Sequence, residues 1–247
     1  MDKNIFELLA CPLHQDNDLI FDNILNVLHC QKCNKNYEMI ENGSSSIPNF
    51  LFDDTNWKKG IRDINSSLIE TFQGFPFKRE LEDNKLILDV GCGENPRGNI
   101  NLDCYIPQKI PQNFVLGNAE YLPFKKNSVD IVLSYYNIEH LINPAIFIQK
   151  MYDIAREKLE IVTDNDEWIG DIFFRVLGVG RIFHDEHYYK WSVEYFKNLI
   201  NRLGYSKNKI YLLNLSTNRL VKLTTLLGVI PRVGNMFYRD LKAEIWK

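Results

Sequence analysis

Two pairs of residues near the N-terminus have the types and spacing of zinc ligands. Cys11 and His14 are separated by two residues, as are Cys30 and Cys33, and 15 residues lie between the two pairs. Two-residue spacing lets a tight turn point both side chains at one ion, and three thiolates with one imidazole satisfy tetrahedral Zn²⁺. A segment of about 50 residues buries too little apolar surface to be stable without help. The pattern predicts a structural zinc site; the alternative is a metal-free small β domain in which these side chains only pack.

A glycine turn follows the first strongly apolar run of the chain. Residues 86–90 have the length of a strand, and Gly91-Cys-Gly93 follows them directly. Glycines at the carboxyl end of a buried strand let the backbone turn sharply and let a ligand approach without meeting a Cβ atom. Asp103 ends the next predicted strand, where its carboxylate can accept hydrogen bonds from both hydroxyls of a ribose. The combination favours a nucleoside over a simple turn. A dinucleotide is disfavoured, because Pro96 stands where Gly-x-Gly-x-x-Gly needs its third glycine.

Three histidines are candidate bases. His140 follows a strand predicted at 129–134, and His184 and His187 lie in a segment rich in aromatic and acidic residues, 183–191. Such side chains could stack on a sugar or an aromatic ring, and an imidazole within reach could take a proton from it. The alternatives are that His140 caps or packs locally and that one of the later pair is only exposed. The spacing of His184 and His187 also resembles that of metal ligands, which we consider the weaker interpretation.

The residues named so far must be positioned by alternating strands and helices. The continuous apolar run at 86–90 suits a strand buried on both faces of a parallel sheet. Six further strands are predicted, at 99–103, 113–117, 129–134, 158–163, 208–214 and 240–246.

Two helices have well-marked ends. One begins with Asn143 as N-cap, followed by a proline in the first helical position. The other begins after Ser192 as N-cap, with Trp191 and Phe196 placed to pack across its start, and it ends at Gly204. Alternation of strands and helices predicts an α/β domain.

The pattern divides the chain into three parts. Residues 1–52 are predicted to form a small, β-rich domain of the zinc-ribbon type. Residues 53–84 are charged and intermittently apolar, and are predicted as a helical linker. Residues 85–247 are predicted as an α/β domain with a Rossmann-like, seven-stranded, mostly parallel sheet and helices on both faces.

Four stretches of the α/β part resemble the motifs of class I S-adenosylmethionine-dependent methyltransferases, in particular their type 11 branch. They are Leu88-Asp-Val-Gly-Cys-Gly93, Gly117-Asn-Ala-Glu-Tyr-Leu-Pro-Phe124, Asn127-Ser-Val-Asp-Ile-Val-Leu-Ser134 and Ile138-Glu-His-Leu141. Their order and spacing match the family over residues 80–165. The resemblance implies an enzyme whose cofactor is S-adenosylmethionine.

The resemblance also implies a set of cofactor-binding residues. The two glycines of the first motif would border the methionine part of the cofactor, and the acid at the end of the second strand would hold the ribose. An Asn-Ala pair would face the adenine, and the last two residues of the fourth strand would line the methyl-transfer site. The full predicted set is Asp89, Gly91, Cys92, Gly93, Asp103, Asn118, Ala119, Ser134 and Tyr135.

Two features depart from the family. Asn118 stands where an aspartate is common, although an amide oxygen can still accept from the amino group of adenine. The usual Lys-Pro-Gly-Gly turn before the fifth strand is replaced by Ala155-Arg-Glu-Lys-Leu159, a change in a structural turn.

The N-terminal segment resembles the small Trm112-like domain through Leu8-Leu-Ala-Cys-Pro12, the Cys30 pair, Tyr37 and Ser46-Ile-Pro48. Four cysteines are usual there, so His14 is a departure that changes metal affinity rather than excluding metal. Such domains, alone or fused, support a methyltransferase structurally or help to hold its substrate. The resemblance therefore implies a structural zinc ion without a chemical role.

Charge and composition constrain the partners. The net charge is −3, which gives no general attraction for nucleic acid. Residues 1–170 carry 16 basic and 26 acidic residues, and residues 171–247 carry 13 and 6. The basic C-terminal part either aids solubility or attracts an anionic substrate. No apolar run reaches the length of a membrane span, and no secretion signal is evident, so a cytoplasmic location and reduced cysteines are expected.

These observations predict methyl transfer to a small-molecule acceptor, such as a sugar, lipid-linked or metabolite hydroxyl. Residues 220–237 are apolar with interspersed cations, and are interpreted as a lid, with peripheral membrane contact or contact with a lipid-linked acceptor as the alternative. Two other functions stay open: an RNA methyltransferase, disfavoured by the acidic N-terminal part, and a non-catalytic partner protein that keeps the fold. Nothing in the sequence indicates the oligomeric state.

Overall fold

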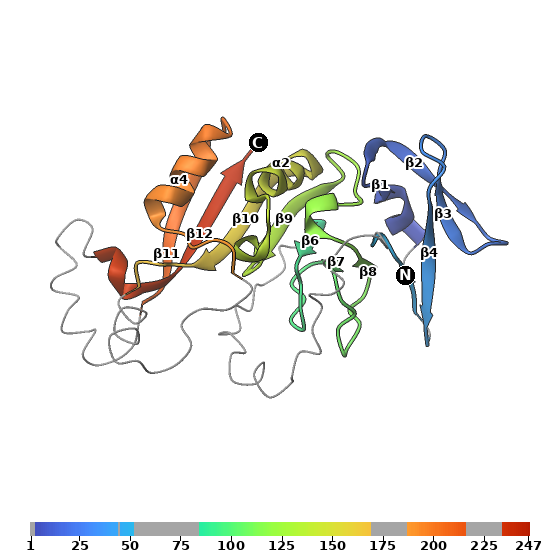
Figure 1. Cartoon of the computed structure of the whole chain (residues 1–247), viewed down its shortest axis with the longest axis horizontal. Helices are drawn as coiled ribbons and strands as arrows, with labels where there is room; N and C mark the ends of the chain where they lie inside the picture. The colour runs from blue at the N-terminus through green and yellow to red at the C-terminus, as the bar shows by residue number, and fades with distance from the viewer. Residues whose placement is uncertain (1–2, 44, 52–83, 169–186, 216–233) are drawn as a thin grey trace. The chain divides into compact units, whose positions relative to one another are not determined.

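The computed structural model describes residues 3–43, 45–51, 84–168, 187–215 and 234–247 (Figure 1). The chain divides into two compact units, residues 1–131 and 132–247. Three predictions lie wholly or largely outside the described residues: the helical linker at 53–84, the segment at 220–237 and the base His184.

The N-terminal part of the first unit is an antiparallel sheet in which the strands follow their order in the chain. After a short 3-10 helix, η1 (Lys3–Leu8), the strands are β1 (Ala10–Cys11), β2 (His14–Asp22), β3 (Val27–Cys30), β4 (Asn36–Asn42) and β5 (Ser45–Pro48). Figure 1 shows β2, β3 and β4 side by side. In β4, Tyr37 and Met39 are buried while Glu38 is exposed, so the strand has one buried face. The predicted β-rich character of this segment is confirmed.

The rest of the first unit contains three parallel strands, β6 (Ile87–Val90), β7 (Ile100–Asp103) and β8 (Phe114–Leu116), followed by the 3-10 helix η3 (Ala119–Tyr121). Every residue of the three strands is buried. This explains why the run at 86–90 is continuously apolar apart from Asp89: strands covered on both faces have no solvent-facing positions for polar residues.

The small sheet and the parallel strands share part of their core. Ile47 of β5 lies in one apolar cluster with Cys92, Phe114 and Leu116. The backbone N–H of Phe50 donates to the carbonyl of Leu116 at 2.8 Å. Within the first unit, the end of the small sheet therefore packs beside β8.

The second unit contains most of β9 (Val129–Tyr135), which crosses the boundary between the units, and the elements that follow it. These are η4 (Ile138–His140), α2 (Pro144–Ile154), β10 (Ala155–Asp164), α4 (Val193–Arg202), β11 (Asn208–Leu215), η6 (Gly234–Phe237) and β12 (Tyr238–Trp246). β12 pairs antiparallel with both β10 and β11, and Figure 1 shows the three strands side by side.

The strand order of the large sheet is β11-β12-β10-β9-β6-β7-β8. The prediction of a seven-stranded sheet in an α/β fold is confirmed, and every one of the seven predicted strands is present. The sheet is mixed, because the ladders of β12 are antiparallel while those of β7 are parallel. Whether helices cover both faces stays a prediction, since the described α-helices are α2 and α4.

Both marked helices begin where their sequences predict. Ser192 accepts a hydrogen bond from the backbone N–H of Tyr195, and the rings of Trp191 and Phe196 lie 5.2 Å apart across the start of α4. Asn143 precedes α2 but makes no capping hydrogen bond through its side chain. Among the described residues, no helix combines the length and apolar character that crossing a membrane requires.

Candidate functional site

The glycine turn after β6 has the conformation that its residues predict. Gly91 and Gly93 have φ angles of 75° and 52°, in the left-handed region that side chains disfavour. The N–H groups of Gly91 and Cys92 both donate to the carbonyl of Leu102, at 2.9 and 3.2 Å. These bonds hold the turn against the end of β7.

Asp103 lies directly beside this turn. Its Oδ2 accepts the backbone N–H of Gly93 at 2.8 Å, and its Oδ1 accepts the N–H of Cys104 at 2.7 Å. Burial raises the pKa of Asp103, and the backbone N–H groups of Gly93, Cys104 and Tyr105 oppose this effect. Gly93 and Asp103, which are ten residues apart in the sequence, are thus in direct contact.

Asp89 supports the turn from within β6. Its Oδ2 accepts the backbone N–H of Arg97 at 2.8 Å, and the Arg97 guanidinium lies 3.9 Å from the same oxygen. Burial and the negative charges of Asp103 and Asp89 raise the pKa of the Cys92 thiol. Burial therefore disfavours the thiolate form of Cys92.

Asn118 and Ala119 follow β8 at the same edge of the parallel strands. The N–H of Gly117 donates to the carbonyl of Asp103 at 2.8 Å, so the end of β8 lies beside the end of β7. The side-chain oxygen of Asn118 accepts the N–H of Glu120 at 2.8 Å and caps η3. The structure thus brings together seven of the nine predicted cofactor residues in the first unit: Asp89, Gly91, Cys92, Gly93, Asp103, Asn118 and Ala119.

Ser134 and Tyr135 belong to the second unit, at the end of β9. Ser134 is fully buried and its Oγ accepts a hydrogen bond from the side chain of Asn137 at 3.2 Å. The hydroxyl of Tyr135 donates to Glu160 at 3.3 Å, and Lys242 lies 3.0 Å from the same carboxylate oxygen. Their predicted place at the methyl-transfer site stays a prediction.

Cys11, His14, Cys30 and Cys33 form one cluster at the ends of β1 and β3. Their ligand atoms all lie within 4.8 Å of one another. The Sγ of Cys11 lies 3.8 Å from that of Cys33 and 3.6 Å from Nδ1 of His14. Around a tetrahedral zinc ion, bond lengths of about 2.3 Å to sulfur and 2.0 Å to nitrogen require edges of about 3.8 Å between two sulfurs and about 3.5 Å between sulfur and nitrogen. The donor set and its spacing therefore fit zinc.

The backbone around the cluster is built for such a site. The N–H of Asn34 donates to the carbonyl of Cys30 at 2.8 Å, and the N–H of Cys30 donates to the carbonyl of Lys35 at 2.9 Å, which closes the turn that carries Cys33. Burial raises the pKa of the Cys11 thiol, opposed by a hydrogen bond at 3.1 Å between its sulfur and the hydroxyl of Tyr37. Burial disfavours the charged thiolate form of Cys11, whereas a bound cation would favour it.

A second cluster, in the second unit, contains Glu139, His140 and His187. Their ligand atoms lie within 4.8 Å of one another, and the two imidazole rings are 4.6 Å apart and nearly perpendicular. Thr163 donates to the Glu139 carboxylate at 3.0 Å. Burial, and the negative charge of Asp164, raise the pKa of Glu139 to about 8.

The two described candidate bases are thus neighbours, but the sequence did not single out Glu139 as a site residue. It lies in the motif Ile138-Glu-His-Leu141, next to a candidate base, and that adjacency was the available signal. Its environment could not be seen locally, because its hydrogen-bond partners Thr163, Tyr188 and Tyr189 lie far along the chain.

The comparisons with known proteins agree with this geometry. Residues 101–159 match a protein family described as a methyltransferase domain. No curated protein matches the chain. A SAM-dependent methyltransferase from Thermotoga maritima superposes with a TM-score of 0.52 at 14% identity, covering 68% of this chain and 84% of its own.

Two further solved structures are similar at lower scores. A SAM-dependent methyltransferase from Archaeoglobus fulgidus has a TM-score of 0.47 at 16% identity, covering 77% of this chain and 94% of its own. A complex between the Haloferax volcanii Trm112 methyltransferase activator and a methyltransferase has a TM-score of 0.42 at 12% identity, with 67% and 83% covered. The fold is similar to that of the Thermotoga methyltransferase, and the matched methyltransferase segment supports an enzyme.

Proposed function

We propose that the chain transfers a methyl group from S-adenosylmethionine to a hydroxyl of a small molecule, such as a sugar, a lipid-linked compound or a metabolite. The observation that carries the proposal is the hydrogen bond between the Gly93 N–H and the Asp103 carboxylate. It brings a left-handed glycine turn and an acidic residue together at the carboxyl ends of parallel strands, where nucleosides bind in α/β folds.

The residues of the first unit fit the cofactor in their chemistry. The Asp103 carboxylate has acceptor capacity for the two ribose hydroxyls, since an ionised carboxylate offers about four lone-pair sites and the backbone occupies only some of them. Gly91 and Gly93 leave the turn without side chains, and the second lone pair of the Asn118 oxygen can accept from the adenine amino group. When bound, the cofactor would supply an electrophilic methyl group on a sulfonium.

The zinc-ribbon assignment of residues 1–52 is a further part of the proposal. Cys11, His14, Cys30 and Cys33 would hold a structural zinc ion, supported by the match between their spacing and a tetrahedron. With four protein ligands the ion has no open position, so it would stabilise the small sheet and take no part in methyl transfer.

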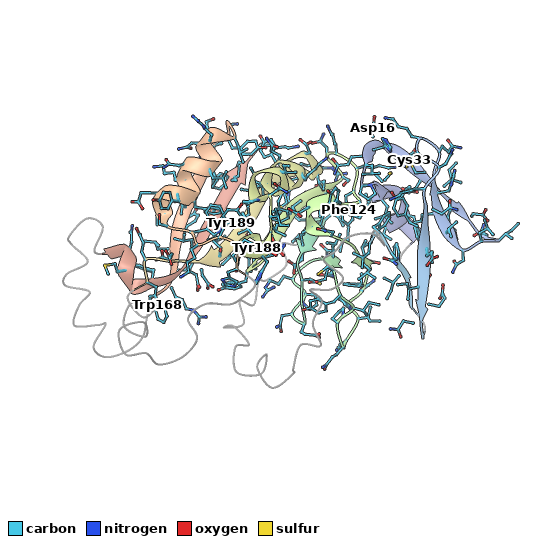
Figure 2. The ribbon with its side chains drawn as sticks, viewed as in Figure 1. Asp16, Cys33, Phe124, Trp168, Tyr188 and Tyr189 are labelled. Atoms are coloured by element: carbon cyan, nitrogen blue, oxygen red, sulfur yellow. The ribbon has the colours of Figure 1, made fainter. Side chains whose placement is uncertain are left out.

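On the acceptor side, we propose that His140 and His187 act near the hydroxyl that receives the methyl group. The exposed rings of Tyr188 and Tyr189, labelled in Figure 2, directly follow His187 and offer faces on which a sugar or a ring can stack. His184, the third predicted base, lies outside the described residues. The acidic N-terminal part favours a small molecule over RNA, because RNA binding depends on neutralising phosphates.

The test is calorimetric titration of the zinc-loaded chain with S-adenosylmethionine and S-adenosylhomocysteine, with Asp103→Asn and Asp103→Ala alongside. Asp103→Asn keeps an oxygen for the Gly93 N–H but loses the charge that binds the ribose hydroxyls. We expect it to weaken binding by about 10-fold to 100-fold, the worth of one or two charge-assisted hydrogen bonds, and Asp103→Ala to weaken it further.

Asp18→Ala is the matched control, because this carboxylate is exposed and forms a salt bridge with Lys125, away from the glycine turn. It should bind the cofactor as the wild type does. If the folded, zinc-loaded wild type binds neither compound, the enzyme assignment is wrong and a non-catalytic partner protein takes its place.

A further inference from the structure

The cluster of Glu139, His140 and His187 joins segments that lie far apart in the chain. The first two residues belong to η4, after β9, and the third lies 47 positions beyond His140. Their ligand atoms nonetheless lie within 4.8 Å of one another. The imidazole rings meet at 85°, an arrangement that two histidines can keep while each turns one nitrogen towards a common point.

Backbone hydrogen bonds hold the two segments together independently of the three side chains. The carbonyl of Glu139 accepts the N–H groups of Tyr188 and Tyr189, at 2.8 and 3.3 Å. The hydroxyl of Tyr189 donates to the carbonyl of Ile142 at 3.0 Å, on the other side of His140. The backbone thus positions His187 against η4 in advance, as a preformed binding site requires.

The charges around the cluster favour a cation. The Glu139 residue is only 2% exposed, and its carboxylate accepts a hydrogen bond from the neutral hydroxyl of Thr163. Asp164 and Asp240 add further negative charge nearby. Of these two acids, Asp240 has a cation close to it, since Arg239 lies 3.9 Å away. A buried carboxylate beside other acids costs less free energy when a positive ion is bound to it.

We propose that Glu139, His140 and His187 bind a divalent metal ion of the zinc type. Two imidazole nitrogens and one carboxylate oxygen form a ligand set that suits Zn²⁺ and its neighbours in the transition series rather than Mg²⁺ or Ca²⁺, which prefer oxygen ligands alone. In a zinc site with nitrogen and oxygen ligands, the ligand atoms lie roughly 3.3 Å apart. The three ligand atoms here lie within 4.8 Å of one another, and small side-chain rotations would bring them to that separation.

Three protein ligands leave at least one coordination position open, in contrast to the closed set around Cys11. An open position takes an oxygen ligand, either water or a hydroxyl of a bound small molecule. In the metal-bound state His140 and His187 are ligands and not free bases, so an acceptor hydroxyl would lose its proton to water under the influence of the ion. This last consequence rests on the proposed methyl transfer, whereas metal binding itself does not.

The experiment counts zinc per chain after equilibration with Zn²⁺ and removal of loosely bound metal, by elemental analysis. His187→Ala and Glu139→Gln are compared with the wild type and with His29→Ala. His29 is the control, because its Nδ1 contacts Asn36 at 2.7 Å and it belongs to neither cluster. Glu139→Gln keeps the size of the side chain and an acceptor for Thr163.

We expect the wild type and His29→Ala to hold one zinc ion more than His187→Ala and Glu139→Gln. Equal counts in all four folded proteins overturn the proposal. If the variants do not fold, the absorption of added Co²⁺, measured on the wild type alone, tests the proposal instead. In a chain that holds zinc only in the Cys/His cluster, added Co²⁺ should give the absorption of a nitrogen- and oxygen-bound ion without thiolate charge transfer, and its absence also overturns the proposal. The cofactor titration is independent of these outcomes, so failure of the metal site and failure of the methyltransferase assignment are distinguishable.

Discussion

The two metal-ligand clusters of this chain are built on opposite plans. The Cys/His cluster has four ligands, two of them fully buried, in a small sheet in which β3 and β4 each have one face more buried than the other. The Glu/His cluster has three ligands, of which the two histidines are partly exposed, beside a large sheet with its own apolar core. In the first, the ligands supplement a small apolar core; in the second, a larger core and the backbone already hold the ligands in place.

This difference predicts what each cluster is for. A small sheet that depends on an ion loses its fold with the ion. A site on an independently stable sheet loses only its ligand when a side chain is removed. Substitutions in the two regions should therefore separate stability from binding, and four of them, ordered by expected effect, test that separation.

The largest effect is expected for Cys30→Ser. It removes a fully buried ligand, and we expect a loss on the order of 5 kcal/mol or more in the stability of β1–β5, since structural zinc contributes roughly 10 kcal/mol to domains that depend on it. Hydrogen exchange in these strands and zinc content are the measurements, with the partly buried Cys104→Ser as control. Full protection of β1–β5 in a zinc-free variant would mean that the sheet is a metal-free β domain.

Gly98→Ala should destabilise the parallel strands by a few kcal/mol without changing zinc content. An added Cβ would lie 2.5 Å from the carbonyl oxygen of Ile100 and 2.8 Å from backbone atoms of Asp89 and Ile87. These atoms belong to β6, β7 and their pairing, so they cannot move freely. The measurement is the urea midpoint of unfolding.

The matched control is Gly43→Ala, where a Cβ meets nothing within 4 Å and only the positive φ of 60° opposes the substitution, a cost of about 1 kcal/mol. If both alanines shift the urea midpoint equally, close packing at Gly98 is not what stabilises this part of the sheet.

Ser192→Ala should cost about 1 kcal/mol, the usual worth of an N-cap. The hydroxyl of Ser192 accepts the N–H of Tyr195, and alanine leaves that donor without its partner. Thermal unfolding measures the change, and Ser192→Asp, which retains an acceptor, should restore most of the stability. If Ser192→Ala leaves the thermal stability unchanged, packing of Trp191 on Phe196 is enough to fix the start of α4.

The smallest effect on stability is expected for His187→Ala in metal-free protein, within about 0.5 kcal/mol. The side chain is partly exposed, and the backbone bonds from Tyr188 and Tyr189 remain. Added Zn²⁺ should raise the unfolding temperature of the wild type more than that of the variant. A loss of several kcal/mol without metal would make the Glu/His cluster a structural element like its counterpart, and would remove the contrast.

The sequence was sufficient where a local pattern determines the structure. The apolar run at 86–90 could be recognised as a buried strand because four consecutive positions of β6 are buried, which leaves no alternation of polar and apolar residues. The contact between Gly93 and Asp103 follows because β6 and β7 are adjacent parallel strands. The Cys/His cluster was equally accessible, because tight turns hold each ligand pair. Ser192 could be identified as a cap because capping involves only its own helix turn.

Long-range pairing was not accessible in this way. The antiparallel direction of β12 is set by partners more than 70 residues earlier, on β10, and no local pattern encodes it. The hydroxyl of Tyr135 bonds to Glu160, and the side-chain oxygen of Asn118 caps η3, so both predicted cofactor residues have structural partners that their motif did not reveal. Glu139 was missed for the same reason, because its hydrogen-bond partners Thr163 and Tyr188 lie far along the chain.

The apolar cluster that joins Ile47 to Cys92 would link two binding equilibria if zinc and the cofactor bind as proposed. Cys92 belongs to the glycine turn and Ile47 to the sheet that carries the Cys/His ligands, so order in one favours order in the other. Thermodynamic reciprocity then requires that, if zinc tightens cofactor binding by some factor, the cofactor tightens zinc binding by the same factor. A chain short of zinc would then be a weaker binder of nucleoside, and saturating cofactor would raise the affinity for the ion.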